Sequence, residues 1–321
     1  MGKIAIQPKK LNGGVQIPPS KSISHRAIIC ASLAKGVSEL KNVGKSEDIS
    51  ATIEAMRAFG AKITEYGDRL VIDGTDTLKA DDIPEINCRE SGSTVRFLVP
   101  LALHCKSPVT FTGTGRLPQR PMNTFFNLFD EFGIAYKTPK DAGLPLTVYG
   151  GKISGAIEIE GNISSQFISG LLFSLPLCPY DSEIIITTAF ESKGYIDMTI
   201  DVLASFGITV HNHNYKKFRI KGNQAYKPMS FTVEADYSQA AFYLAAGALG
   251  SFVVCKGLSA ETKQGDKKII DVIERMGGKV ASDPENGIAA LPAKLHGCTV
   301  DVSQIPDLVP AIAVLASAAS G

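Results

Sequence analysis

Residues 53–64, IEAMRAFGAKIT, contain the pattern that decides the fold, because it returns three more times along the chain. Apolar residues three and six positions before an apolar–glycine pair lie on one face of a predicted helix, and Gly is a common helix stop. Short alternating runs typical of strands follow. The pairs are Phe59-Gly60, Phe132-Gly133, Phe206-Gly207 and Met276-Gly277, so the spacings are 73, 74 and 70 residues.

A second pattern repeats out of phase with the first. Small polar residues open an apolar helix near positions 21, 92, 165, 238 and 308, at steps of 71, 73, 73 and 70 residues. Each repeat therefore predicts strand, helix, strand, helix, strand, strand, which is an α/β fold of βαβαββ units. We expect four complete units and the start of a fifth. The pattern stops inside a helix at residues 311–316, which suggests a chain truncated at its C-terminus.

Two domains are expected from the length and the repeat. A chain of 321 residues is too long for one ordinary core, and repeats of this size bury their faces only against one another. Three units, residues 18–226, are predicted to close one substrate-binding domain. Residues 227–321, with residues 1–17 and a strand expected at 3–7, are predicted to form an incomplete second domain.

The bulk composition excludes several classes of protein. With 44% apolar and 20% charged residues and a net charge of +1, the chain is not expected to bind nucleic acid or an anionic membrane. Six scattered cysteines without a C-x-x-C spacing, no leader pattern and no long apolar stretch predict a cytoplasmic protein. The unfinished domain would expose apolar surface near residues 308–316, so self-association is expected.

The stretch 18–26, PPSKSISHR, predicts a helix start that binds an anion. Ser20 after two prolines is a typical N-cap, yet Lys21, His25 and Arg26 follow it without an acid, where helices disfavour cations. Ser22 and Arg26 share a helix face, and a hydroxyl with a guanidinium at a helix start suits a phosphate or carboxylate. The alternative is a solvated basic first turn.

Other loops of the repeat carry similar groups. If pseudo-symmetry brings these loops together, they predict a site for small ligands with several negative charges, although a turn, a surface Arg or a plain cap explains each one alone. No nucleotide-binding motif is present, and neither a metal nor a cofactor is expected. The candidate residues are Gly92, Ser93, Arg120, Ser164, Ser165 and Gln166.

Six motifs in order give the chain a family resemblance: PSKSISHRA at 19–27, SGSTVR at 91–96, LPQRPM at 117–122, SSQF at 164–167, SKGYID at 192–197 and IPD at 305–307. The chain resembles the enolpyruvyl transferases, in the branch that acts on shikimate 3-phosphate, over essentially its whole length. The resemblance implies two domains of three βαβαββ units and a usually monomeric protein that is a glyphosate target. It also implies transfer of the enolpyruvyl group of phosphoenolpyruvate to the 5-hydroxyl of shikimate 3-phosphate, with release of phosphate, in aromatic amino-acid biosynthesis.

The resemblance also implies roles for single residues. Lys21 and Asp307 would be catalytic, although an Asp after Pro at a helix start is also a normal cap. Phosphoenolpyruvate would contact Lys21, Gly92, Ser93, Arg120 and Gln166. Shikimate 3-phosphate would contact Lys21, Ser22, Arg26, Ser164, Ser165, Gln166, Ser192, Tyr195 and Asp307.

Three rival interpretations remain at this point. The first is a catalytically silent anion-binding chain, because the truncated form is expected to have little or no activity alone. The second is the sister enzyme that acts on a UDP-amino sugar, which lacks the run at 20–26. The third is an RNA-end-processing cyclase of similar units, disfavoured by a net charge of +1 and no basic stripe.

Overall fold

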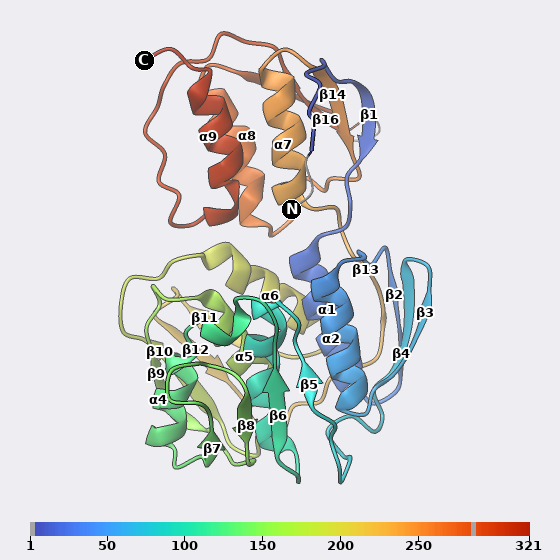
Figure 1. Ribbon diagram of the computed structural model, residues 1–321, viewed down its shortest axis with the longest axis vertical. Coiled ribbons are helices and arrows are strands. Elements are labelled where there is room, and N and C mark those ends of the chain that lie inside the picture. Colours follow the sequence, from blue (N-terminus) through green and yellow to red (C-terminus); the bar gives the residue numbers. More distant parts are fainter. Residues whose placement is uncertain (1–3, 284–286) are drawn as a thin grey trace. The chain divides into compact units, whose positions relative to one another are not determined.

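Two compact units make up the structure, a computed structural model that describes residues 4–283 and 287–321. We call Pro19–Val233 the central unit, and Met1–Pro18 together with Glu234–Gly321 the terminal unit. Each unit has its own cluster of buried apolar side chains. Figure 1 labels the elements of both units.

Four sheets of four strands repeat one topology. In each sheet one edge strand, the first in the orders below, runs parallel to its neighbour, and the remaining strands pair antiparallel. The orders are β13-β2-β4-β3, β5-β6-β8-β7 and β9-β10-β12-β11 in the central unit and β1-β14-β16-β15 in the terminal unit. This repetition confirms the predicted α/β fold of strand–helix repeats.

The strands are short, and β4 of the central unit alternates buried positions with more exposed ones. Those of the central unit are β2 (Val37–Lys41), β3 (Lys62–Tyr66), β4 (Arg69–Asp73), β5 (Ile86–Asn87), β6 (Val109–Thr112), β7 (Tyr136–Lys137), β8 (Leu146–Val148), β9 (Gly155–Ile159), β10 (Ser182–Ile186), β11 (Val210–His213), β12 (Lys217–Ile220) and β13 (Ser230–Thr232). Those of the terminal unit are β1 (Asn12–Gln16), β14 (Phe252–Lys256), β15 (Lys279–Asp283) and β16 (Gly287–Leu291).

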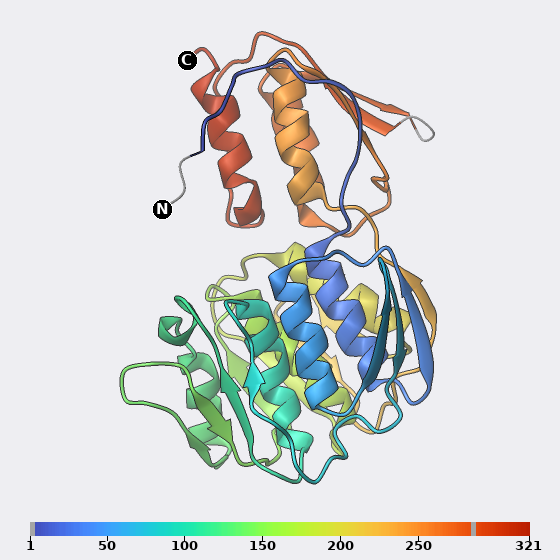
Figure 2. The same ribbon diagram turned by 45° about the vertical axis from the view of Figure 1, so that its right-hand side comes forward.

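Helices fill the interior of the central unit, and its sheets lie outside them (Figures 1 and 2). Every residue of α1 from Ile23 onward is buried, including the polar side chains of His25 and Arg26. Contacts run from α1 to α2 and α6, and from α5 to α3 and α6. The helices are α1 (Lys21–Leu33), α2 (Glu47–Ala58), α3 (Gly92–Leu98), α4 (Asn123–Glu131), α5 (Ser165–Ser174) and α6 (Lys193–Ser205).

The terminal unit packs three helices against its one sheet. Tyr237 is fully buried at the start of α7, and Leu308 and Leu315 are buried around α9. The helices are α7 (Tyr237–Ala248), α8 (Ile269–Arg275) and α9 (Val309–Ser317). Within the part of the chain that the structure describes, no helix combines the length and apolar character needed to cross a bilayer.

Two strands belong to a different unit from the helix that follows them in the chain. β1 precedes α1 in the chain, yet it pairs with β14 of the terminal unit, and β13 precedes α7, yet it pairs with β2 of the central unit. The division therefore comes at Val233 rather than at 226. The strand expected at 3–7 is also misplaced, because β1 lies at 12–16, residues 4–7 are not in a strand, and residue 3 is outside the described residues.

Candidate anion-binding site

The start of α1 has the predicted cap and a partner that sequence reasoning missed. The Ser20 hydroxyl accepts a hydrogen bond from the Ile23 amide at 3.4 Å, and the first turn holds no acid. The exposed Lys21 ammonium lies 3.0 Å from Oδ2 of Asp48, in the first turn of α2. An acid that α1 lacks is therefore supplied by the neighbouring helix, and Lys21 is held near the start of its own helix.

Arg26 is buried, with 2% of its surface exposed. Its Nε donates to Thr199 Oγ1 at 2.7 Å, and Nη1 and Nη2 donate to the carbonyls of Ser22 and Tyr195 at 2.8 and 3.0 Å. The guanidinium also lies over the Phe97 ring, and burial lowers its pKa to about 10. The structure thus brings Arg26, Ser22 and Tyr195 together, with three of the five guanidinium N–H groups used internally.

A second cluster surrounds the start of α3. Ser91 caps this helix by accepting from the Thr94 amide at 3.1 Å, and Gly92 follows in a buried position. A Cβ added to Gly92 would lie 2.9 Å from Nη1 of Arg120, 3.4 Å from Nη1 of Arg96 and 3.7 Å from Oε1 of Gln166. Glycine therefore lets two guanidinium groups and an amide approach the helix start closely.

Gln166 connects the starts of α3 and α5. Its Nε2 donates to Ser93 Oγ at 2.9 Å, and its Oε1 accepts from Arg96 Nη1 at 2.7 Å. Burial and the nearby Arg120 lower the pKa of Arg96. Among the described residues neither guanidinium forms an ion pair with a carboxylate, so their mutual repulsion favours a bound anion.

The serines at the starts of α5 and α6 differ in how their hydroxyls are used. Ser164 caps α5 by accepting from the Gln166 amide at 3.3 Å, and Ser165 follows, partly buried. Ser192 precedes α6 with φ 57°, and its side chain makes no capping hydrogen bond there. The Ser192 hydroxyl is therefore not committed to its own helix.

Asp307 belongs to the terminal unit, whereas the other predicted site residues belong to the central unit. It is exposed in the short 3-10 helix η5 (Pro306–Leu308). No side-chain cap bond is found at the start of η5 or of α9 within the described residues, so the structure does not support the capping interpretation. Beside it, burial is the main cause that raises the pKa of Asp266 to about 6, with charge repulsion from Asp307 adding to it.

Comparison with known proteins decides the family. The model of the family described as EPSP synthase (3-phosphoshikimate 1-carboxyvinyltransferase) matches residues 6–321. The chain belongs to the EPSP synthase family. A 3-phosphoshikimate 1-carboxyvinyltransferase of Clostridium perfringens strain SM101 is 50% identical over 321 residues, covering 100% of this chain and 76% of that protein. The Clostridium kluyveri protein of the same name is 47% identical and 75% covered.

Solved structures agree on the fold of this EPSP synthase family member. EPSP synthase from Acinetobacter baumannii superimposes with a TM-score of 0.77 at 23% identity, over 95% of this chain and 70% of that one. The enolpyruvyl transferase NikO from Streptomyces tendae gives a TM-score of 0.72 at 15% identity, over 97% and 74% of the two chains. At these identities the likeness shows the fold alone.

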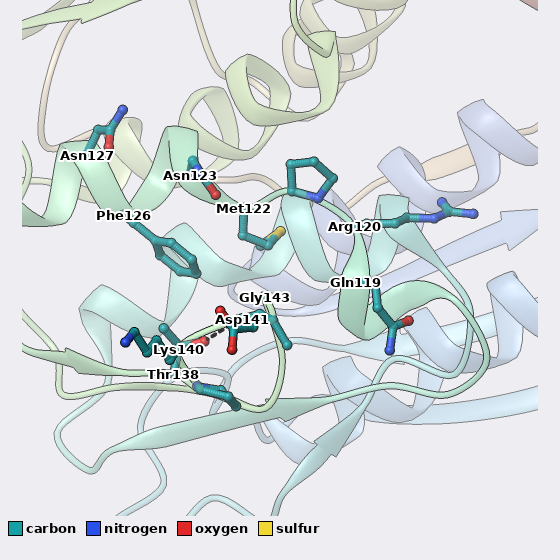
Figure 3. Close-up of a pocket in the computed structure, with 13 residues that line it drawn as sticks. Gln119, Arg120, Met122, Asn123, Phe126, Asn127, Thr138, Lys140, Asp141 and Gly143 are labelled. Atoms are coloured by element: carbon teal, nitrogen blue, oxygen red, sulfur yellow. Dashed lines mark hydrogen bonds between the residues drawn. The ribbon is translucent and has the colours of Figure 1, made fainter.

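A cavity borders the second cluster of this EPSP synthase family member. It has a volume of about 550 Å³ and is lined by residues 119–123, 126, 127 and 138–143, which come from the end of the 3-10 helix η2 (Leu117–Gln119), the start of α4 and a later loop. Figure 3 shows Phe126 and Asp141 facing this space, whereas the Arg120 side chain extends away from them. Arg120 therefore stands at the rim, with its guanidinium directed out of the cavity and close to Gly92.

Sequence reasoning missed two residues of this site. Asp48 was not singled out because its role depends on α2 lying beside Lys21, and Arg96 was included only as the last residue of the SGSTVR motif. No set of three or more His, Cys, Asp or Glu residues in the described chain is arranged to hold a metal ion.

Proposed function

We propose that this chain binds shikimate 3-phosphate and phosphoenolpyruvate and transfers the enolpyruvyl group between them, releasing phosphate. The observation that carries the proposal is the pairing of Arg96 and Arg120 beside Gly92 without a carboxylate partner among the described residues. Two cations brought together in this way need an anion to lower their repulsion. The names of the matched family and of the relatives indicate the reaction in which that anion takes part.

The two substrates are assigned to the two clusters. Phosphoenolpyruvate is assigned to Lys21, Gly92, Ser93 and Arg120. Lys21 lies at the acid-free start of α1, Gly92 and Ser93 lie at that of α3, and Arg120 reaches Gly92. Gln166, which is hydrogen-bonded to Ser93 and Arg96, is assigned to both substrates. Shikimate 3-phosphate is assigned to Ser22, Arg26, Ser164, Ser165, Ser192 and Tyr195.

The chemistry requires one base and one acid. Removing the proton of the 5-hydroxyl makes its oxygen nucleophilic toward the central carbon of phosphoenolpyruvate, while the methylene carbon gains a proton. The resulting adduct then loses phosphate, and its new methyl group returns one proton to the acid, which leaves the enolpyruvyl ether. We assign the base role to Asp307 and a shared role in proton transfer and phosphate binding to Lys21.

Titration calorimetry with phosphoenolpyruvate, in the presence of shikimate 3-phosphate, tests the assignment. Arg120→Gln should weaken phosphoenolpyruvate binding about tenfold or more, because a charge-assisted hydrogen bond contributes about 1.5–3 kcal/mol. Arg116→Gln is the matched control, since Arg116 is exposed in the same segment and is not near Gly92. Equal binding by Arg120→Gln and the unmodified chain would exclude the assignment.

A silent anion-binding chain is the second candidate function. The chain covers 76% of its Clostridium perfringens relative, and the predicted shikimate 3-phosphate contacts other than Asp307 lie in the central unit. A phosphate-release assay with both substrates separates the two: turnover supports the transferase, whereas saturable shikimate 3-phosphate binding without turnover supports the silent form.

We also place the chain in the cytoplasm, because all six cysteines are free thiols.

A further inference from the structure

A chain of buried hydrogen bonds crosses three helices below the site. His25 Nδ1 of α1 lies 2.7 Å from Thr52 Oγ1 of α2, which lies 2.7 Å from Thr94 Oγ1 of α3. Thr94 Oγ1 in turn donates to Ser91 Oγ at 2.7 Å. None of these side chains is more than 1% exposed. This connection, which we call the His25 relay (His25, Thr52, Thr94 and Ser91), ends at the N-cap of α3.

Counting protons along the His25 relay fixes the histidine tautomer. A hydroxyl has one proton to donate, and that of Thr94 goes either to Ser91 Oγ at 2.7 Å or to the Asp48 carbonyl at 3.4 Å, and in neither case to Thr52. Thr52 must therefore donate to Thr94, and its oxygen accepts from His25 Nδ1. The ring is then a neutral imidazole with its proton on Nδ1. Its Nε2 is a bare acceptor, which agrees with this buried atom having no hydrogen-bond partner among the described residues.

The surroundings of His25 also keep the ring neutral. Burial lowers its pKa to about 3, Lys21 and Arg26 act in the same direction, and Asp48 only partly opposes them. The edge of the Phe97 ring packs against the imidazole at 6.3 Å between centroids. A charged imidazolium would need an acceptor at Nε2, and none is recorded in the described chain.

We propose that His25 is a positioning residue that holds the start of α3 in register with the start of α1. The Ser91 oxygen receives both the Thr94 hydroxyl and the Thr94 amide, so the relay sets the orientation of the cap just before Gly92 and Ser93. Lys21 and Ser22 lie one turn before His25 on α1. The ligand expected at Gly92 rests on the proposed function, whereas the relay does not.

Nitrogen-15 NMR of the histidine rings tests the tautomer directly. The His25 signals, assigned by their loss in His25→Asn, should show a protonated Nδ1 and an unprotonated Nε2 at neutral pH and still at pH 5. Proton on Nε2, or an imidazolium at neutral pH, would overturn the relay. This measurement does not depend on any substrate.

Binding and amide exchange test the positioning role. Phosphoenolpyruvate is titrated while the NMR signals of the Gly92 and Ser93 amides are followed. His25→Leu and Thr52→Val should each weaken binding about tenfold, since each breaks a buried hydrogen bond, and should speed hydrogen exchange at the Thr94 amide. His25→Asn, which keeps a short donor, should recover binding to within about threefold.

His104→Leu is the matched control. His104 is a second largely buried histidine, and its Nε2 lies 2.9 Å from the Ser174 hydroxyl, away from the start of α3. It should reduce stability without changing phosphoenolpyruvate binding or Thr94 exchange. Unchanged Thr94 exchange in His25→Leu, or no recovery in His25→Asn, overturns the inference. Absence of phosphoenolpyruvate binding in the unmodified chain contradicts the proposed function instead, and Thr94 exchange then decides the relay alone.

Discussion

Several arginines of the candidate site lie in environments that charged side chains ordinarily avoid, and neighbouring residues hold them there. Arg26 is buried and gives three N–H groups to oxygen atoms of the protein. Arg96 and Arg120 lie close together beside a glycine. Such arrangements cost free energy, and the anion that we propose to bind here would offset that cost.

Substituting Gly92 should separate binding from stability. The Cβ of Gly92→Ala would meet the end of the Arg120 side chain at 2.9 Å, and this flexible group moves rather than the backbone. Alanine also favours a helix over glycine by about 1 kcal/mol. We expect unchanged or raised thermal stability with about tenfold weaker phosphoenolpyruvate binding, measured by calorimetry and thermal unfolding. Binding equal to that of the unmodified chain would show that Arg120 does not act here.

His25 should make the protein sensitive to acid. Its pKa is about 3 in the folded chain against 6.5 for an ordinary histidine, so its contribution to stability is present above pH 6.5 and is lost as the pH falls toward 3. Between pH 6.5 and 5 the loss should be about 2 kcal/mol. Urea unfolding at several pH values checks this, and His25→Asn should have a flatter profile over this range. Parallel profiles for the two proteins would contradict the expectation.

At the scale of elements, the anion site that we propose lies at the starts of three helices. α1, α3 and α5 have no acid in their first turns, whereas α2 begins with Glu47 and Asp48. A helix that carries no acid in its own first turn keeps unpaired N–H groups for a ligand. Serine caps at Ser20, Ser91 and Ser164 keep these helices stable without adding negative charge.

Close packing of α3 and α5 should depend on Gly170. A Cβ at this position would collide with the Arg96 carbonyl oxygen, which is backbone and cannot turn aside. We expect Gly170→Ala to destabilise the chain by about 1–3 kcal/mol through overpacking, measured by urea unfolding. Gly133→Ala is a control for introducing a methyl group, because nothing lies within 4 Å of its added Cβ, although its φ of 65° strains the backbone there. A smaller loss at Gly170 than at Gly133 would contradict the packing argument.

At the scale of the whole molecule, the boundary between the units does not follow the order of the repeats, because β1 and β13 each belong to a different unit from the helix that follows them. β13 follows the last predicted residue of the first domain, yet it pairs parallel with β2. Its surroundings add an Asn42 Nδ2 bond to the Val233 carbonyl at 2.7 Å and a contact between the rings of Phe206 and Phe231. The central unit is therefore complete only with this strand.

Two fragments should differ sharply in folding. Residues 19–233 should unfold cooperatively, whereas residues 19–226 should be less stable by roughly 2–4 kcal/mol, because they lose the β13 pairing and buried contacts of Phe231. The exposed edge of β2 should also promote aggregation. Circular dichroism with urea titration and light scattering checks both points. Equal stability of the two fragments would show that β13 adds nothing to the central unit.

The amino-acid sequence alone determined the features that depend on near neighbours in the chain. The spacing of apolar residues and glycines predicted the order of strands and helices, and the caps at Ser20 and Ser164 were readable within one helical turn. The cations at the start of α1 were visible in the same way.

Only the tertiary structure decided what distant segments do together. The pairing of β1 with β14 and of β13 with β2, the ion pair of Lys21 with Asp48 and the His25 relay join residues many positions apart. Helical periodicity and capping act over a few residues, so a local pattern records them. Strand pairing and buried proton donors depend instead on which surfaces meet when the chain closes, and no local pattern encodes that choice.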